Sequence, residues 1–279
     1  MQKFVEQKFI GERAMFGAKD AEFERCGFAA GESPLKHGQN LRLKNCAFEW
    51  KYPLWYTKNV AVEDGFLMQM ARAGIWYAQD VSFKDTLIQA PKSFRRCQNV
   101  RLENVNLTQA EETLWSCEGV EIKNVCARGD YFAMNCENVR VCGLNLDGNY
   151  GFDGCKNVLV EDSKLLSKDA FWNCENVTVR NSFISGEYLA WNSKNVTFEN
   201  CVIESLQGLC YVQNLVLRGC QTLDTTLAFE YSSVDVEILG GIASVKNPLS
   251  GVIRAKEIGE IIMDEECVDP AATKIILEK

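Results

Sequence analysis

The sequence predicts an all-β protein: a single right-handed parallel β-helix solenoid of about twelve coils, each of roughly 19 residues with three short strands. Three observations predict this fold. An Asn-Val or Asn-Leu pair recurs every 19 to 21 residues. Apolar residues keep fixed distances from that pair, and Asn, Asp or Gly stands between the apolar groups. Self-similarity at such a period is typical of solenoids, in which each coil contacts only its neighbours.

One position in each coil, called the marker below, sets the register of the repeat. It holds an Asn at Asn40, Asn59, Asn99, Asn138, Asn157, Asn176, Asn195 and Asn214. Other residues occupy it at Asp20, Asp80, Gly119 and Ser233. An apolar residue follows directly and another comes two residues later, with polar residues beside them. This period of two indicates a strand with one buried and one exposed face.

Two further groups of positions complete the coil. A turn residue stands five after the marker, and a small and an apolar residue follow it, which predicts a second short strand. A third apolar column lies five before the marker, which predicts a third strand. The gaps fit neither hexapeptide nor pentapeptide repeats, and 19 residues leave little room for the helical half of a leucine-rich repeat. A right-handed crossover is the default for parallel strands.

The 13 cysteines are predicted to be free thiols rather than a disulfide or zinc framework. Several recur at the coil period, as Cys97, Cys117, Cys136, Cys155 and Cys174 do. No Cys-x-x-Cys pair occurs. Such cysteines act as small apolar residues of the core.

Charge and composition narrow the partners. The chain has 30 basic and 38 acidic residues, a net charge of −8, which argues against nucleic acid and anionic membranes. No apolar run reaches the roughly 18–20 residues of a membrane span. The N-terminus mixes charges where an export signal needs an apolar stretch, so we expect a cytoplasmic protein.

An aromatic column runs four residues before the marker. Its neighbour at five before is apolar, so strand parity predicts that the aromatic column faces outward. Exposed rings on successive coils would form a stacking platform, and the negative charge favours a saccharide over nucleobases. The predicted substrate-binding residues are this column and the tyrosines of an adjacent polar band: Trp55, Trp76, Arg95, Trp115, Tyr131, Tyr150, Trp172, Tyr188 and Trp191.

Carboxylates recur beside the aromatic column on central coils. Acids on adjacent coils would lie about 5 Å apart and acids two coils apart about 9–10 Å, which spans retaining and inverting glycosidase geometries. The candidate catalytic residues are Glu112, Asp130, Asp153 and Asp169. An elimination that uses a basic side chain as the base is a weaker alternative, because lysine needs desolvation and arginine rarely loses its proton.

No metal or cofactor site is predicted. His37 is the only histidine, so it is the only residue around which a nucleophilic triad could form, and no nucleophile motif accompanies it. Oxygen-bearing residues gather at Asp147, Asn149 and Asp153, but their spacing matches no calcium loop.

The two ends of the chain depart from the repeat. We expect residues 1–263 to form the β-helix, with residues 1–19 as an N-terminal cap and 20–263 as coils. Residues 264–279 form a tail that caps the other end or pairs with a second copy of the chain.

Over residues 20–263 the chain resembles the pectin-lyase-like β-helix superfamily. More narrowly it resembles a cytosolic microbial family catalogued as a domain of unknown function. The segments that carry this likeness are GERAMF (11–16), GESPLK (31–36), KYPLWY (51–56), GDYFAMN (129–135) and KDAFWNC (168–174). The resemblance implies the fold and brings no assigned reaction, and no catalytic motif of the wider superfamily matches.

Three functions stay open from the sequence. The first is hydrolysis of a small intracellular saccharide by two of the four acids, with Trp115 and Trp172 stacking the sugar. The second is a solenoid that binds a saccharide or a protein without chemistry. The third is a purely structural solenoid with packed aromatics. The sequence leaves open whether the protein is an enzyme.

Overall fold

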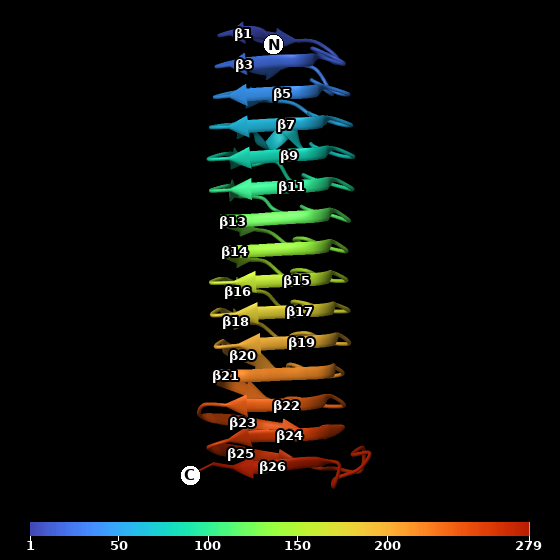
Figure 1. Cartoon of the computed structure of the whole chain (residues 1–279), viewed down its shortest axis with the longest axis vertical. Helices are drawn as coiled ribbons and strands as arrows, with labels where there is room; N and C mark the ends of the chain where they lie inside the picture. The colour runs from blue at the N-terminus through green and yellow to red at the C-terminus, as the bar shows by residue number, and fades with distance from the viewer. Residues whose placement is uncertain (279) are drawn as a thin grey trace. The chain divides into compact units, whose positions relative to one another are not determined.

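The computed structural model describes residues 1–278, and these form an all-β protein of short parallel strands (Figure 1). The described residues contain no α-helix; a single 3-10 turn, η1, spans Gln69–Ala71. No helical segment in this range has the length and apolar character to cross a bilayer. The chain divides into two compact units, Met1–Asn145 and Leu146–Lys279.

In the first unit each turn begins with a longer strand and continues with a shorter one. The longer strands are β1 (Gln2–Val5), β3 (Lys19–Glu24), β5 (Gln39–Lys44), β7 (Lys58–Glu63), β9 (Gln79–Lys84), β11 (Gln98–Glu103) and β13 (Glu118–Arg128). The shorter strands are β2 (Lys8–Ile10), β4 (Gly27–Ala29), β6 (Ala47–Phe48), β8 (Phe66–Leu67), β10 (Leu87–Ile88) and β12 (Asn106–Leu107). The unit boundary falls within β14 (Glu137–Asp147).

The second unit repeats this arrangement. Its longer strands are β15 (Lys156–Glu161), β17 (Glu175–Arg180), β19 (Lys194–Glu199), β21 (Gln213–Thr226), β22 (Ser233–Ile238), β24 (Ser250–Ala255) and β26 (Thr273–Leu277). The shorter strands are β16 (Lys164–Leu166), β18 (Phe183–Ser185) and β20 (Val202–Leu206). Two further strands, β23 (Gly241–Lys246) and β25 (Glu257–Ile262), pair with each other in parallel.

The predicted register is confirmed, because equivalent residues of successive turns pair directly. Leu41 lies opposite Val60 and Leu43 opposite Val62 between β5 and β7, and all four side chains are buried. The fold is a parallel β-solenoid of the right-handed type with about fifteen turns, where the sequence predicted about twelve. The additional turns start at β1, β24 and β26, which lack the marker motif. Whether residues 1–19 and 264–279 act as caps stays a prediction.

The third side of the turn differs from the predicted strand. Every second residue there has a left-handed backbone, as at Tyr52 (φ 62°), Leu54 (φ 59°) and Tyr56 (φ 56°). The hydrogen bonds still run between turns: the Tyr52 N–H donates to the Arg72 carbonyl at 3.2 Å and the Leu54 N–H to the Pro34 carbonyl at 3.0 Å. Within residues 1–278 this side carries isolated bridges, such as Trp76 with Arg95, and no continuous ladder. A typical turn therefore has two strand segments, which are continuous in β13, β14 and β21, and a linked left-handed segment.

The marker asparagines form hydrogen-bonded ladders between turns. Asn59 Nδ2 donates to Asn40 Oδ1 at 2.9 Å, and Asn195 Nδ2 donates to Asn176 Oδ1 at 2.9 Å. These residues also have positive φ, for example 54° at Asn40. Asparagine suits the position because it tolerates the left-handed region and its amide both donates and accepts.

The cysteines are free, and ten of the thirteen are buried. Cys97 and Cys117 donate their thiols to backbone carbonyls of the preceding turn, those of Ile75 and Phe94, at 2.8 and 3.2 Å. They fill the core beside the apolar columns, as their period predicts.

Candidate functional site

The candidate residues lie on the third side of the turn. The column five before the marker points into the core, and the column four before it points away. Ile75 is fully buried, whereas the next residue, Trp76, is half-buried. The same relation holds for Leu114 and Trp115. The predicted outward orientation of the column therefore agrees with the structure, although the indoles are only partly exposed.

In the first unit the indoles stack on one another. Trp55 and Trp76 have ring centroids 5.0 Å apart at an interplanar angle of 8°. The Arg95 guanidinium lies between two indoles, 4.6 Å from the centroid of Trp76 and 4.7 Å from that of Trp115. Lys36 Nζ lies 5.5 Å from the Trp55 ring. Because a sugar stacks on a ring face, this geometry does not favour Trp55, Trp76 or Trp115 as platforms.

A second aromatic column lies beside the first. His37 stacks on Tyr56 at 5.0 Å, and Tyr56 on Tyr77 at 4.9 Å. Phe16 meets the other face of His37 edge-on at 5.4 Å. The single histidine is thus packed between rings, as expected for a structural role.

Glu112 is held as a carboxylate by two cations. Lys92 Nζ and Arg95 Nη2 each lie 2.9 Å from one of its oxygens. Burial alone would raise the pKa of Glu112, but the hydrogen bonds and charges of Lys92 and Arg95 outweigh it and hold the pKa below its ordinary value. Such a group is a poor proton donor. Asp130, on the next turn, accepts the Glu112 N–H at its own backbone carbonyl at 3.0 Å.

The second unit brings Asp153 and Asp169 together. They lie on adjacent turns, and the charge of Asp153 raises the pKa of Asp169. Asp169 is only 6% exposed. Within residues 1–278 its carboxyl group has no hydrogen-bond donor and no ion-pair partner; its backbone N–H donates to the Glu187 carbonyl at 2.8 Å. The described residues with a fully buried, unpaired polar side-chain atom are Arg95 and Thr113, so the Asp169 oxygens keep some contact with solvent, while the burial around them disfavours the charged form.

The pKa of Asp169 is raised, chiefly by burial. The charge of Lys168 lowers it in part, and those of Glu187 and Asp153 raise it. The pKa of Asp153 is also raised by burial, which the hydrogen bond from Asn173 opposes. Both carboxyl groups therefore have pKa values above the ordinary aspartate value, chiefly because of burial, and the charge of Asp153 adds to the shift at Asp169.

An asparagine relay orients Asp153. Asn192 Nδ2 donates to Asn173 Oδ1 at 2.8 Å, and Asn173 Nδ2 donates to Asp153 Oδ1 at 3.4 Å. Sequence reasoning did not single out these two asparagines. Their spacing of 19 residues, three before each marker, is the signal that could have found them.

Aromatic residues occur on the turns that carry the two acids and on the next turns. The Trp172 carbonyl accepts the Gly154 N–H at 2.8 Å, which places Trp172 on the turn after Asp153. Among residues 1–278 no other ring packs on Trp172. In the first unit, by contrast, Trp55 and Trp76 cover each other's ring faces. Trp191 contacts Tyr188 edge-on at 5.5 Å and Tyr211 at 4.7 Å. Tyr150 donates its N–H to the Lys168 carbonyl at 2.8 Å.

The basic residues near both groups are committed to ion pairs. Lys168 Nζ lies 3.1 Å from Glu187 Oε2, and this hydrogen bond raises the pKa of Lys168. Lys92 and Arg95 both bind Glu112. A base for elimination needs a lowered pKa, so the geometry does not favour that chemistry.

A buried acid outside the predicted set is also neutralised. Glu230 is 4% exposed, and Lys246 Nζ lies 2.8 Å from its Oε1 while Gln207 Nε2 donates to its Oε2 at 3.1 Å. Both carboxylate oxygens of Glu230 thus have a partner, which indicates a structural role. No group of three or more His, Cys, Asp or Glu side chains in the described chain is arranged to hold a metal ion.

Comparison with protein families places the chain. A family model described as protein of unknown function (DUF3737) matches residues 2–276. The chain belongs to the DUF3737 family. This confirms the narrower resemblance predicted from the sequence motifs. Among curated proteins no sequence matches this DUF3737 chain.

Three solved structures show the distant likeness of the DUF3737 chain to other proteins. PfbA, a surface adhesin of Streptococcus pneumoniae, is 12% identical with a TM-score of 0.43, over 84% of this chain and 76% of that one. The A-module of the mannuronan C-5 epimerase AlgE4 of Azotobacter vinelandii is 9% identical with a TM-score of 0.31, over 99% and 88%. The catalytic unit of a GH87 α-1,3-glucanase of Streptomyces thermodiastaticus is 12% identical with a TM-score of 0.30, over 78% and 48%. At these scores the likeness says nothing about the function of the DUF3737 chain.

Proposed function

We propose that the second unit carries a glycoside-hydrolysing site in which Asp153 and Asp169 act together. The observation that supports this most is Asp169: the residue is 6% exposed, its carboxyl group has no donor within residues 1–278, and the charge of Asp153 on the preceding turn raises its pKa further. A protein keeps such a costly group where it serves a purpose, and a pair of carboxyl groups is the usual machinery of glycosidases.

The different environments of the two acids support different roles for them. Asp169 is the less exposed residue and its carboxyl group receives no hydrogen bond within residues 1–278, which favours its protonated form, so it is the proposed general acid. Asp153 accepts a hydrogen bond from Asn173 and is the carboxylate of the pair. Two carboxyl groups with different environments separate acid and base roles in this way.

The proposed step balances as a hydrolysis. The Asp169 O–H donates its proton to the glycosidic oxygen as the bond from the anomeric carbon to that oxygen breaks. The Asp153 carboxylate either attacks the anomeric carbon or takes a proton from the attacking water, and water supplies the new hydroxyl group. These two roles of Asp153 correspond to retention and inversion of configuration.

Trp172 is the proposed sugar platform. Its ring carries no other aromatic ring among residues 1–278, and it lies on the turn next to Asp153. Trp191, Tyr150 and Tyr188 line the neighbouring turns as further contacts. A small saccharide in the cytoplasm is the proposed substrate, because ten buried free thiols suit a reducing compartment.

A non-catalytic scaffold that binds a saccharide or a protein is the second candidate. The absence of chemistry in the first unit is supported by Glu112, whose carboxylate is neutralised there by Lys92 and Arg95. In that unit the polar and aromatic residues of the same side stabilise the solenoid.

Turnover on a panel of p-nitrophenyl glycosides and reducing-end-labelled oligosaccharides tests the proposal. We expect hydrolysis of at least one member, and a loss of about 10²–10⁴-fold in kcat in Asp169→Asn and Asp153→Asn. Asp224→Asn is the matched control, because Asp224 is an exposed carboxylate of the same unit without an ion pair in the described chain. If sugars bind but none of those that bind is hydrolysed, the result favours the non-catalytic scaffold and rejects the proposed hydrolase.

A further inference from the structure

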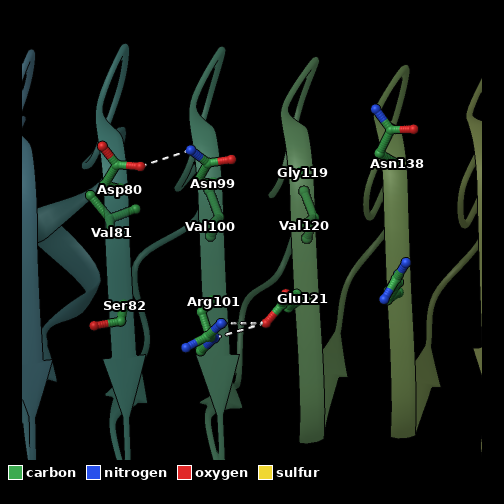
Figure 2. A pocket seen from close by; sticks show the side chains of 11 residues that line it. Asp80, Val81, Ser82, Asn99, Val100, Arg101, Gly119, Val120, Glu121 and Asn138 are labelled. Atoms are coloured by element: carbon green, nitrogen blue, oxygen red, sulfur yellow. Dashed lines mark hydrogen bonds and ion pairs between the residues drawn. The ribbon is translucent and has the colours of Figure 1, made fainter.

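A groove with a volume of about 560 Å³ lies on the outer face of the longer strands of the first unit. Figure 2 shows Asp80, Asn99, Gly119 and Asn138 at equivalent places of β9, β11, β13 and β14. The polar lining is completed by Ser82, Arg101, Glu121 and Arg140. None of these residues belongs to the acid pair or to the aromatic columns.

The groove opens where the marker ladder is interrupted. Asn99 Nδ2 donates to Asp80 Oδ1 at 2.7 Å (Figure 2). In an intact ladder the amide of the next turn would donate to the Asn99 oxygen, as Asn59 does to Asn40. Gly119 stands there instead and has no side chain. Asn99 Oδ1 therefore has no donor within residues 1–278 and faces the space that the missing side chain leaves.

The charges of the groove leave one cation without an anion. Arg101 Nη2 binds Glu121 Oε2 at 2.8 Å (Figure 2). Arg140, also exposed, has no ion pair or hydrogen bond to its guanidinium in the described part of the chain. A guanidinium matches the geometry of carboxylate and phosphate groups.

We infer that this groove binds a small hydroxylated anion, such as a sugar phosphate or a sugar acid. Arg140 binds the anionic group, and Asn99 Oδ1 accepts a hydroxyl of the ligand in place of the missing amide. β11 and β14 are separated by β13, and Arg140 stands two residues further along its strand than Asn99, so the Cα atoms of the two residues lie about 12 Å apart, a span that the Arg140 side chain and a monosaccharide with one anionic substituent can bridge together.

Gly119→Asn tests the inference by completing the ladder. The backbone accepts the change, because φ is 68° at Gly119 and 55° at Asn99. The added Cβ would lie 2.9 Å from Asn99 Oδ1, a side-chain end that can turn as it does in the intact ladders. The new amide would fill the hollow and donate to the Asn99 oxygen, so we expect a folded protein with a blocked groove.

Gly143→Asn is the matched control. Gly143 interrupts a different ladder in the same way, since a Cβ there would lie 2.8 Å from Asn124 Oδ1. Its φ is 73°, and it does not line the groove. Any general effect of adding an asparagine at such a place appears in this variant as well.

Isothermal titration calorimetry of the full chain with glucose 6-phosphate and with glucuronate measures the binding, and inorganic phosphate and glucose serve as reference probes. We expect one of the two anionic sugars to bind at least tenfold more tightly than either reference probe. Arg140→Gln and Gly119→Asn should each weaken that binding at least tenfold, while Gly143→Asn leaves it unchanged. Preference between the two sugars identifies the anion.

Three results would overturn the inference: neither anionic sugar binds more tightly than the reference probes, binding survives in Gly119→Asn, or Gly143→Asn weakens it equally. Asp169→Asn leaves every groove residue in place. Failure of the groove and failure of the acid pair are therefore distinguished by separate variants.

Discussion

The carboxyl group of Asp169 shows how the surroundings of one residue can disfavour its ionised form. Burial disfavours its ionised form, and its neighbour Asp153 adds a second negative charge. The protonated form avoids both penalties. At this position the folded protein binds a proton more tightly than the unfolded chain does.

This difference predicts the pH dependence of stability. The pKa of Asp169 is raised in the folded state, so its favourable contribution is complete below the ordinary aspartate pKa of about 3.9 and is lost as the pH rises through the raised value. Wild type should therefore lose more free energy of unfolding than Asp169→Asn between about pH 4 and pH 7. Urea denaturation across this range measures it.

Asp224→Asn is the control for that measurement, because Asp224 is exposed. Its pH profile should parallel that of wild type. An Asp169→Asn profile that also parallels wild type would show that the Asp169 pKa is not raised.

The sequence could predict some of the candidate acids, but not which of them are neutralised by a neighbouring cation. Asp153 and Asp169 were predicted as acids on adjacent coils, and the structure places them on adjacent turns with interacting charges. Glu112 looked equivalent in the sequence. Its neutralisation depends on how Arg95 and Lys92 turn toward it, and side-chain direction does not follow from the period of a repeat.

At the scale of an element, the asparagine ladders link a backbone requirement to a side-chain bond. Asn176 has a φ of 59°, donates to Asn157 Oδ1 at 3.0 Å and accepts from Asn195 at 2.9 Å. Glycine adopts the positive φ but makes no side-chain hydrogen bond. Alanine does neither.

Substitution at Asn176 should separate the two contributions. Asn176→Ala should lower the free energy of unfolding by about 2–4 kcal/mol, from two lost hydrogen bonds and about 1–2 kcal/mol of left-handed strain. Asn176→Gly should cost about 1–2 kcal/mol less than Asn176→Ala, because glycine is not strained there. Chemical denaturation measures both, and equal losses would contradict the role of φ.

Arg95, which lies between the indoles of Trp76 and Trp115, is a second contact that stabilises neighbouring turns. Arg95→Ala should lower the free energy of unfolding by about 1–3 kcal/mol, because two cation–π contacts and an ion pair are lost. Denaturation followed by tryptophan fluorescence measures this loss.

Arg101→Ala removes an exposed ion pair without ring contacts and should cost at most about 1 kcal/mol. A loss in Arg95→Ala no larger than in Arg101→Ala would show that the stack contributes little.

The third side of the turn marks the limit of reading strands from apolar periodicity. Alternation of buried and exposed residues continues there, so the outward column was predicted correctly. The backbone alternates between left-handed and other conformations, however, and a period of two does not reveal the sign of φ. The tyrosines and leucines at positive φ are held by contacts between turns, which overrule local preference.

At the scale of the whole molecule, the reactivity of the thiols measures whether the core is packed. Cys126 and Cys142 are exposed and Cys267 is half-buried, whereas ten others are buried. A thiol reagent should therefore modify at most three cysteines of the native protein rapidly. All 13 should react after denaturation, which mass spectrometry counts. Rapid modification of the Cys97 to Cys174 series in the native state would contradict the packing.

The fold itself was the most predictable property, because each turn repeats the same solution and errors in one copy are corrected by the others. The turns that begin at β1, β24 and β26 were missed because terminal turns lack the marker. Terminal repeats are usually atypical, since one of their faces has no neighbouring turn. Caps at both ends and pairing with a second copy through residues 264–279 remain predictions.

The most direct test of the central claim is a titration of the Asp169 side-chain carboxyl carbon by NMR, in wild type and in Asp153→Asn. We predict a pKa above the ordinary aspartate range in wild type. In Asp153→Asn the pKa should fall, because the neighbouring negative charge has gone while burial remains. An ordinary pKa in wild type, unchanged by Asp153→Asn, would show that the two carboxyl groups do not share a site.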